Sequence, residues 1–310
     1  MKLVSFVIPC YRSAHTITGV TEELKTAMAA LPGCDYEIVL VNDCSPDGTW
    51  DVIRGLAEND GHIVAVDLAK NFGQHAALMA GLRHTAGEIV VCLDDDGQTP
   101  GSEAGKLIRK LEEGYDVVYA AYEHKQHAAW RNFGTVLNNR MTEIMLGKPR
   151  ELTITSYFAM RRFIVDEMLV YHNCYPYVEG LILRATRRIG TVPVTHRARE
   201  EGESGYTLVK LFSLWMNGFT SFSVKPLRIA TYTGAVAALI GFIYFIVILV
   251  KHFVDSSIPE GWASTMALML LLGGIILLVL GMIGEYVGRI FMCINASPQY
   301  VERQVVRKRG

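Results

Sequence analysis

Residues 89–96 read IVVCLDDD, five apolar residues followed directly by three carboxylates, and residues 97–100 read GQTP. An unbroken apolar run rich in β-branched residues is typical of a strand buried on both faces of a parallel sheet. Ligands of open α/β sheets gather at the carboxyl ends of such strands. On an extended chain, Asp94 and Asp96 point to one side and Asp95 to the other. Two such carboxylates suit Mg²⁺ or Mn²⁺; the alternative is an acidic turn that begins the next helix.

The segments on both sides of this stretch alternate between strand and helix patterns. Apolar runs predict strands at residues 3–8, 37–41, 63–68 and 116–120. Amphipathic segments predict helices at residues 16–30, 49–58, 74–84 and 101–113. This alternation indicates βαβ crossovers and a mostly parallel, doubly wound sheet of the α/β class. Further along, the pattern predicts a helix at 129–146 and strands at 153–160 and 191–194.

The loop after the first predicted strand distinguishes this sheet from a nicotinamide-binding one. A dinucleotide-binding sheet needs Gly-x-Gly-x-x-Gly at this place, so that the backbone can approach the pyrophosphate. Residues 9–15 read PCYRSAH and contain no glycine. The dehydrogenase class is therefore excluded.

The net charge and the cysteine content narrow the possible classes of protein further. The formal net charge of −1 over 310 residues gives no reason to expect a nucleic-acid partner. The six cysteines are scattered without a Cys-x-x-Cys pair, so no zinc site is predicted and reduced thiols are expected. The first residues run straight into a strand pattern, without a secretory signal peptide. The sheet domain is therefore expected in the cytoplasm.

Two runs without charged residues, at 229–250 and 263–283, follow the sheet domain. Each has the ~20 residues that cross ~30 Å of hydrocarbon. Residues 207–226 precede them with an amphipathic pattern, and this position favours a helix that lies in the membrane interface. The loop between the runs carries one lysine and two acids, whereas lysines and arginines gather on the other side. The positive-inside rule then places both termini in the cytoplasm.

These patterns predict four parts of the chain. They are a sheet domain at 1–206, an interfacial helix at 207–226, a two-helix transmembrane domain at 227–288 and a basic cytoplasmic tail at 289–310. A metal-binding sheet domain beside a membrane indicates substrates from two phases. A nucleotide diphosphate sugar would come from the cytosol, and the acceptor would be a lipid with its head at the membrane surface. A divalent ion suits this chemistry because it neutralises charge on the departing nucleoside diphosphate.

Six short segments occur in a fixed order along the chain: VIPCY (7–11), VNDCSPDGT (41–49), NFGQH (71–75), LDDDGQTP (93–100), REEGESGY (199–206) and GEYVGR (284–289). Together they resemble the family-2 glycosyltransferases that load a sugar onto polyprenyl phosphate, such as dolichyl-phosphate mannose synthase and bacterial undecaprenyl-phosphate glycosyltransferases. The resemblance covers nearly the whole chain. It implies a GT-A-type, Rossmann-like fold and a metal-dependent, inverting transfer at the cytoplasmic face of the inner membrane, by a homo-oligomer.

The resemblance also implies roles for individual residues. Contacts to the nucleotide sugar are expected from Pro9, Tyr11, Asp43, Asn71, Gly73, Asp94 and Gln98. Asp94 and Asp96 are expected to bind the metal, with Asp96 the more direct ligand. Contacts to the lipid phosphate or the diphosphate are expected from Arg131, Arg199 and Ser204, and Arg199 joins the two aspartates as a catalytic residue. The simpler alternatives are that Asp43 caps its turn, that Gly73 only starts a helix and that the arginines are surface charges.

The expected acceptor explains why no His–carboxylate or Ser–His pair stands out. A phosphate monoester has a second pKa of about 6 and is largely ionised at neutral pH, so it can attack the sugar without a general base. Catalysis then reduces to positioning and charge stabilisation. Direct displacement of this kind predicts inversion at the anomeric carbon.

Three places depart from the family pattern. Arg12-Ser13 replaces an Asn-Glu pair, Ser156-Tyr157-Phe158 replaces an Asp-Phe-Arg-like segment, and Gly205 stands where a lysine is common. These changes indicate an unusual donor or an impaired activity. Two alternatives therefore remain open. A processive polysaccharide synthase would carry a Gln-x-x-Arg-Trp segment, which is absent, and more than two spans; a degenerate domain would bind nucleotide sugar as a scaffold for a flippase.

Overall fold

The computed structural model describes residues 1–122, 152–195 and 261–308, together with isolated residues such as 143, 148, 149 and 227 and several between 232 and 246. The chain divides into two compact units. The first comprises residues 1–214 and 296–310, and the second comprises residues 215–295. The predicted helix at 129–146, the interfacial helix at 207–226 and the first predicted span at 229–250 lie outside the described residues, apart from those isolated positions.

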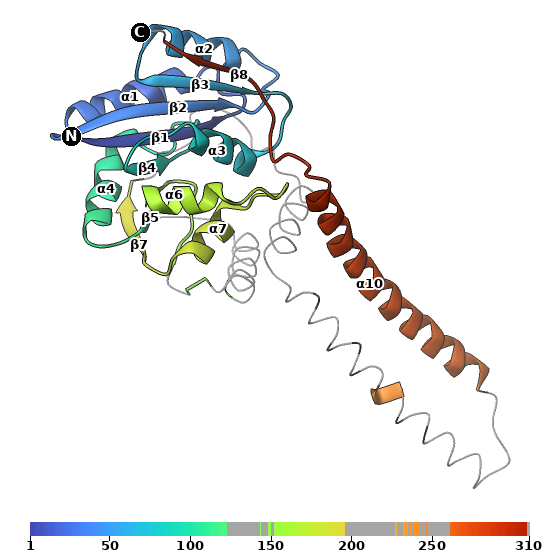
Figure 1. The fold of residues 1–310 in the computed structure, drawn as a ribbon. Helices are drawn as coiled ribbons and strands as arrows, with labels where there is room; N and C mark the ends of the chain where they lie inside the picture. Colours follow the sequence, from blue (N-terminus) through green and yellow to red (C-terminus); the bar gives the residue numbers. More distant parts are fainter. Residues whose placement is uncertain are drawn as a thin grey trace. The chain divides into compact units, whose positions relative to one another are not determined.

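The described residues of the first unit form one eight-stranded sheet (Figure 1). Its strands are β1 (Lys2–Cys10), β2 (Cys34–Asn42), β3 (Ile63–Leu68), β4 (Ile89–Cys92), β5 (Val117–Tyr122), β6 (Phe158–Arg161), β7 (Ile189–Val194) and β8 (Glu302–Arg307). Their order in the sheet is β7-β5-β6-β4-β1-β2-β3-β8. Strands β1 to β4 pair in parallel, as do β5 and β7, whereas β6 and β8 run antiparallel to their neighbours. The prediction of a mostly parallel α/β sheet is confirmed.

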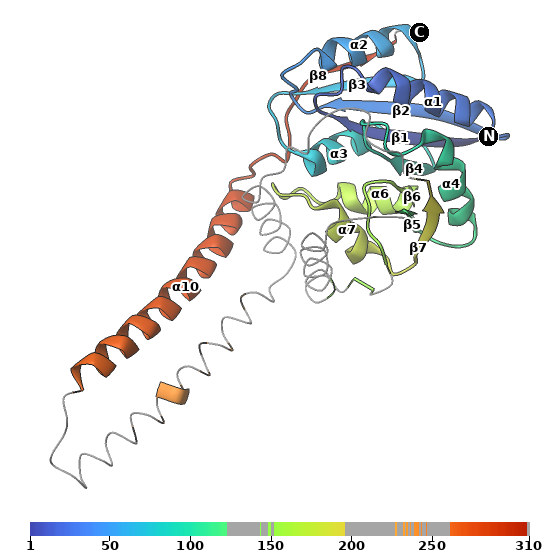
Figure 2. The ribbon, with the colours of Figure 1, turned by 180° about the vertical axis from the view of Figure 1, so that it is seen from behind.

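Two groups of helices cover the two faces of this sheet (Figures 1 and 2). The helices are α1 (Ile17–Ala29), α2 (Thr49–Asn59), α3 (Gln74–Arg83), the short η1 (Gly101–Glu103), α4 (Ala104–Glu112), α6 (Arg162–Leu169) and α7 (Val178–Ala185). Helix α1 packs against α2 and α4, whereas α3 packs against α6 and α7.

Alternation along β1 explains how one strand serves both faces. Phe6 and Ile8 belong to the buried cluster that includes Leu24 of α1. Val7 points the other way, toward Gly81 of α3. Because side chains alternate along a strand and all three positions are fully buried, the run reads as continuously apolar. Burial on both faces holds β1 in the centre of the sheet, and the loop that follows it contributes to the candidate site.

The C-terminal segment corrects one prediction. Residues 302–307 were expected within a basic tail, but they form β8, which pairs antiparallel with β3. Three of the six residues, Glu302, Arg303 and Arg307, are charged, and β8 lies at the sheet edge with most of its side chains exposed. Such a polar edge strand lacks the apolar alternation by which strands are recognised, so its pairing with β3 defines it.

The second unit contains α10 (Trp262–Ile294), which is longer than the predicted span at 263–283. The charge-free run stops at Ile283, but the helix continues, and within this continuation Glu285 and Arg289 form an i,i+4 ion pair of 2.7 Å. Within the described residues, one helical segment, Leu272–Ile294, is long and apolar enough to cross a membrane, with a mean hydropathy of 1.9.

Candidate active site

Four loops meet at the carboxyl edge of the parallel strands, after β1, β2, β3 and β4. Strands β1, β2 and β3 are in register, so Cys10 lies beside Asn42 and Asn42 lies beside Asp67. Parallel strands in register deliver the loops that follow them to the same edge of the sheet. Hydrogen bonds between these loops then position the acidic side chains.

Asp94 is held from two sides. Gln74, the first residue of α3, donates from Nε2 to Asp94 Oδ1 at 3.0 Å. The hydroxyl of Ser156, just before β6, donates to the other carboxylate oxygen. Burial, helped by the charges of Asp96 and Asp95, raises the pKa of Asp94 to about 6, although the two hydrogen bonds act to lower it. The carboxylate is therefore fixed in place and sits in a strongly negative environment.

Asp95 belongs to the same loop but has different partners. The backbone N–H of Tyr11 donates to its Oδ2 at 2.9 Å, and the Ser13 hydroxyl donates to the same oxygen. β4 ends at Cys92, so the alternation expected of an extended chain does not extend to the aspartates. Asp95 nevertheless has different hydrogen-bond partners from Asp94, and both of them, Tyr11 and Ser13, belong to the loop after β1. This contact fixes the position of the first loop relative to the aspartates.

Asp96 closes the acidic turn. Its Oδ1 accepts a hydrogen bond from the backbone N–H of Gln98 at 3.0 Å. Gly97, between them, adopts a φ of 70°, a conformation that glycine tolerates better than any other residue. The turn therefore follows the carboxylates immediately and directs the chain toward η1 and α4.

Asp43 forms a second acidic position, at the end of β2. Its two carboxylate oxygens accept hydrogen bonds from the backbone N–H groups of Phe72 (2.7 Å) and Gly73 (2.9 Å). Asn71 donates from Nδ2 to the backbone carbonyl of Asp43 at 3.2 Å. Burial raises the pKa of Asp43, and the two N–H donors partly oppose that rise. Asp43 therefore does not merely cap its own turn. The N–H groups that donate to its carboxylate come from the loop after β3.

The loop after β2 is also joined to the loop after β1. Ser45 Oγ accepts from the backbone N–H of Arg12 at 2.8 Å and donates to Asp47 Oδ1 at 2.6 Å. Thr49 Oγ1 accepts from the N–H of Ser13 at 3.0 Å. Arg12 itself has a φ of 60°. These hydrogen bonds hold the loop after β1 and the loop after β2 together.

The sequence-predicted residues are distributed as follows. The structure brings the backbone of Tyr11 to Asp95, and it brings Asn71 and Gly73 to Asp43. Pro9 lies within β1, which extends through it to Cys10. Gln98 contacts Asp96 through its backbone. Arg131, Arg199 and Ser204 lie outside the described residues, so their roles remain predictions.

Three residues of this edge were not assigned a role from sequence. Gln74 and Ser156 both contact Asp94, and Ser13 contacts Asp95. Gln74 lies inside a recognised segment, next to residues that were assigned. Ser13 and Ser156 lie in segments noted only as departures from the family pattern. Their position in these segments was the only indication that the two serines matter. The sequence could not show that they contact Asp95 and Asp94, which are far away along the chain.

The acidic turn fits a divalent cation of the Mg²⁺ or Mn²⁺ kind. The charge of Asp96 raises the pKa values of Asp94 and Asp95, so a positive ion at this place would relieve the repulsion. In the part of the chain that the structure describes, no three His, Cys, Asp or Glu side chains form a complete metal cage. Mg²⁺ typically takes one or two carboxylates and completes its shell with water and substrate phosphates. The donor set matches that pattern.

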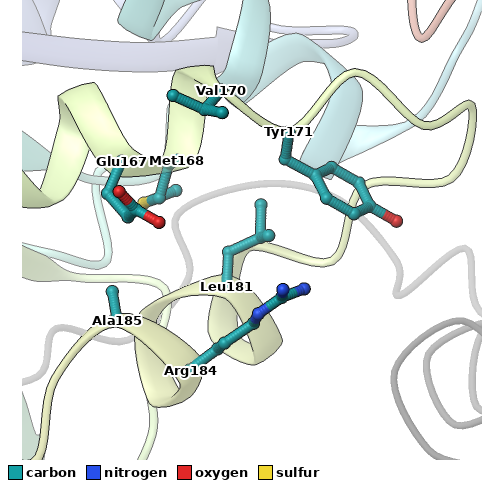
Figure 3. A pocket seen from close by; sticks show the side chains of 7 residues that line it. All are labelled: Glu167, Met168, Val170, Tyr171, Leu181, Arg184 and Ala185. Atoms are coloured by element: carbon teal, nitrogen blue, oxygen red, sulfur yellow. The ribbon is translucent and has the colours of Figure 1, made fainter.

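A separate small pocket opens between α6 and α7 (Figure 3). Its volume is about 140 Å³. Side chains from both helices and the segment between them line it, including Tyr171, Leu181 and Arg184. None of the predicted site residues contributes to it, and the pocket is too small for a nucleotide sugar, since ligand pockets typically span ~300–1,000 Å³.

The mostly parallel sheet with an acidic turn at its carboxyl edge is compatible with a GT-A-type fold, and comparison with known proteins identifies the family. Residues 5–169 match the description "Glycosyl transferase family 2", and residues 225–290 match "GtrB C-terminal hairpin". The chain belongs to glycosyl transferase family 2, as its six segments predict.

Curated relatives align along almost the whole chain. The undecaprenyl-phosphate 4-deoxy-4-formamido-L-arabinose transferase of Klebsiella pneumoniae (strain 342) is 35% identical, over 99% of this chain and 95% of the relative. The enzyme of the same name from Enterobacter sp. (strain 638) is 34% identical, over 98% and 94%. Among solved structures, a glucosyl-3-phosphoglycerate synthase from Mycobacterium tuberculosis, in complex with Mn²⁺, UDP-glucose and phosphoglyceric acid, has a TM-score of 0.51 at 18% identity, over 71% and 78%. That likeness concerns the fold.

Proposed function

We propose that this chain transfers a sugar from a nucleotide diphosphate sugar to undecaprenyl phosphate at the cytoplasmic face of the inner membrane. The observation that carries the proposal is the similarity to undecaprenyl-phosphate sugar transferases, which extends from the sheet domain through the hairpin. The acidic turn at the carboxyl edge of the sheet supports it, because that edge is where α/β sheets bind nucleotides.

The pairing of β8 with β3 supports the proposed membrane arrangement. β3 precedes the matched hairpin in sequence and β8 follows it, yet both strands belong to one sheet. A chain that leaves a domain for the membrane and returns to the same domain crosses the membrane an even number of times. Two spans, at 229–250 and within α10, satisfy this requirement, and the interfacial helix at 207–226 would lead into the first.

In this proposal the nucleotide lies over the loops after β1, β2 and β3, against Tyr11, Asp43 and Asn71. Asp94 and Asp96 would hold Mg²⁺ or Mn²⁺, which neutralises charge on the departing nucleoside diphosphate. Gln74 and Ser156 keep the Asp94 carboxylate fixed, so no reorganisation is needed when the donor arrives. Arg131, Arg199 and Ser204 are proposed to contact the phosphates of the donor or the lipid.

A sugar-transfer assay on the wild type and on an Asp96→Ala variant tests whether the chain is an enzyme or a scaffold. Purified full-length protein is offered UDP-, GDP- and dTDP-sugars, Mg²⁺ or Mn²⁺, and radiolabelled undecaprenyl phosphate. We expect labelled lipid product from one pair and a loss of at least ~10²-fold in Asp96→Ala, because removing a fixed group that stabilises transition-state charge typically costs this much. Asp51→Ala, an exposed change on α2, is the matched control. Donor binding without turnover in the wild type would instead support the scaffold.

The stereochemistry of the product is a second test. The ionised phosphate attacks the anomeric carbon on the face opposite the departing diphosphate, so direct displacement inverts the configuration. NMR of the purified product should show the anomer opposite to that of the donor. Retention of configuration would mean that an enzyme nucleophile takes part, and the direct mechanism would be wrong.

A further inference from the structure

Arg303 of β8 reaches a buried carboxylate that lies beside the candidate donor site. Its Nη1 donates to Asp67 Oδ2 at 3.3 Å, and its Nη2 donates to the backbone carbonyl of Ala69 at 3.0 Å. The Asp67 side chain is only 3% exposed, whereas that of Arg303 is 58% exposed. A buried carboxylate is costly unless it is both paired and hydrogen-bonded. The strand that follows the membrane hairpin in sequence therefore supplies the counter-charge.

An irregularity in the strand pairing places this arginine. Gln304 lies opposite Asp67 and Glu302 lies opposite Leu68, so the intervening Arg303 has no partner residue of its own. An extra residue of this kind is a β-bulge, and bulges redirect side chains and occur often next to active sites. The segment before the bulge is anchored as well, because Ala69 donates its N–H to the Val301 carbonyl at 2.8 Å.

Asp67 in turn orients a buried amide. Asn42 donates from Nδ2 to Asp67 Oδ1 at 2.7 Å. An ionised carboxylate only accepts hydrogen bonds, so the Asn42 NH₂ group must face it and the amide oxygen must face away. That oxygen, Oδ1, accepts the backbone N–H of Ser45 at 3.2 Å. Asn42 is 3% exposed, so water does not readily replace either partner.

The turn fixed in this way belongs to the candidate donor site. Ser45 also binds the backbone N–H of Arg12, and Asp43, the residue after Asn42, is held by the loop after β3. We propose that Arg303 is a positioning residue for the donor: by compensating Asp67, it holds the Asn42 amide and the 43–47 turn in the shape that binds the nucleotide. This inference rests on the proposed function, since it assigns the nucleotide to that edge.

Full-length protein in nanodiscs tests the proposal with Arg303→Ala, Arg303→Lys and a control, Arg307→Ala. Arg307 lies on the same strand and is exposed, and among the described residues it donates to the His84 carbonyl, at 3.5 Å. UDP, GDP and dTDP binding with Mn²⁺ is measured by calorimetry, and donor KM, acceptor KM and kcat are measured by lipid transfer. We expect Arg303→Ala to raise the nucleotide Kd and the donor KM about tenfold, with the acceptor KM unchanged, as for the loss of one coupled charge interaction. Arg303→Lys should restore most of the affinity, and Arg307→Ala should resemble the wild type.

A second variant separates positioning from folding. In an Asp67→Asn background the buried charge is absent, so adding Arg303→Ala should change the nucleotide Kd little further. If Arg303→Ala lowers the melting temperature but leaves the Kd and donor KM at wild-type values, β8 only stabilises the sheet and the proposal is wrong. Wild-type protein that binds none of the three nucleotides also overturns it. Wild-type protein that binds nucleotide but transfers no sugar contradicts the proposed function alone, because the Kd still reports on Arg303.

Discussion

Gly73 shows how a single backbone conformation supports the donor site. It adopts a φ of 90°, which side-chain-bearing residues rarely reach, and its N–H donates to Asp43. A Cβ at this position would meet no atom within 4 Å, so the cost of adding one lies in the backbone and not in packing. The glycine is therefore needed for the geometry of the Asp43 cradle.

We predict that Gly73→Ala destabilises the protein by about 1–3 kcal/mol, the usual cost of a sparsely populated backbone conformation, and weakens nucleotide binding. Urea unfolding and calorimetry with UDP and GDP measure the two effects. Gly48→Ala is the matched control, because Gly48 also has open space around it but an ordinary φ of −73°. Equal effects of the two substitutions would contradict the backbone argument.

Individual residues of the site differ in whether they could be predicted from the sequence. The segments that contain Asp43, Asn71, Gly73 and the aspartates could be recognised because each segment is contiguous. Their mutual contacts could not, since Ser156 and Asp94 are 62 residues apart in sequence. The chain order gives no distance between them, and only the pairing of β4 with β6 brings them together.

At the scale of elements, helix α3 packs on the sheet and also contacts the candidate site. It begins at Gln74, which contacts Asp94, and it approaches the sheet closely at Gly81. A Cβ at residue 81 would lie 2.4 Å from Val7 Cγ1 and 2.9 Å from Val41 Cγ2. Contacts this short require the helix or the strands to move.

We predict that Gly81→Ala costs about 1–3 kcal/mol of stability, as overpacking of a filled core usually does, and displaces the start of α3. Gly19→Ala, at an exposed position of helix α1 with nothing within 4 Å, should instead be neutral or stabilise by up to ~1 kcal/mol. In a Val7→Ala background the penalty of Gly81→Ala should shrink, since one of the obstructing methyl groups is gone. Urea unfolding of the three single variants and the double variant measures these effects, and an unchanged penalty in the Val7→Ala background would locate the strain elsewhere.

At the scale of the whole molecule, the prediction concerns which side of the membrane each part faces. Cysteine is introduced at Ser256, in the loop between the two apolar runs, or at Ser102, exposed on the sheet domain. Cys34, Cys44, Cys174 and Cys293, which are partly exposed, are replaced by serine. In intact cells an impermeant maleimide should label position 256 but not position 102, and permeabilisation should expose both. Labelling of position 102 in intact cells would reverse the proposed orientation.

The sequence by itself determined the features that depend on local pattern and composition. The apolar run at 89–93 predicted a buried strand, the alternation of segments predicted a mostly parallel sheet, and the carboxylates at 94–96 indicated a ligand edge. Tertiary structure decided what depends on partners: the donors to Asp94, and the pairing of β8. Arg303 and Asp67 are separated by 236 residues, and a polar edge strand becomes a strand only beside its neighbour. Periodicity reports the surroundings of a segment, whereas a contact between distant residues arises only once the sheet has formed.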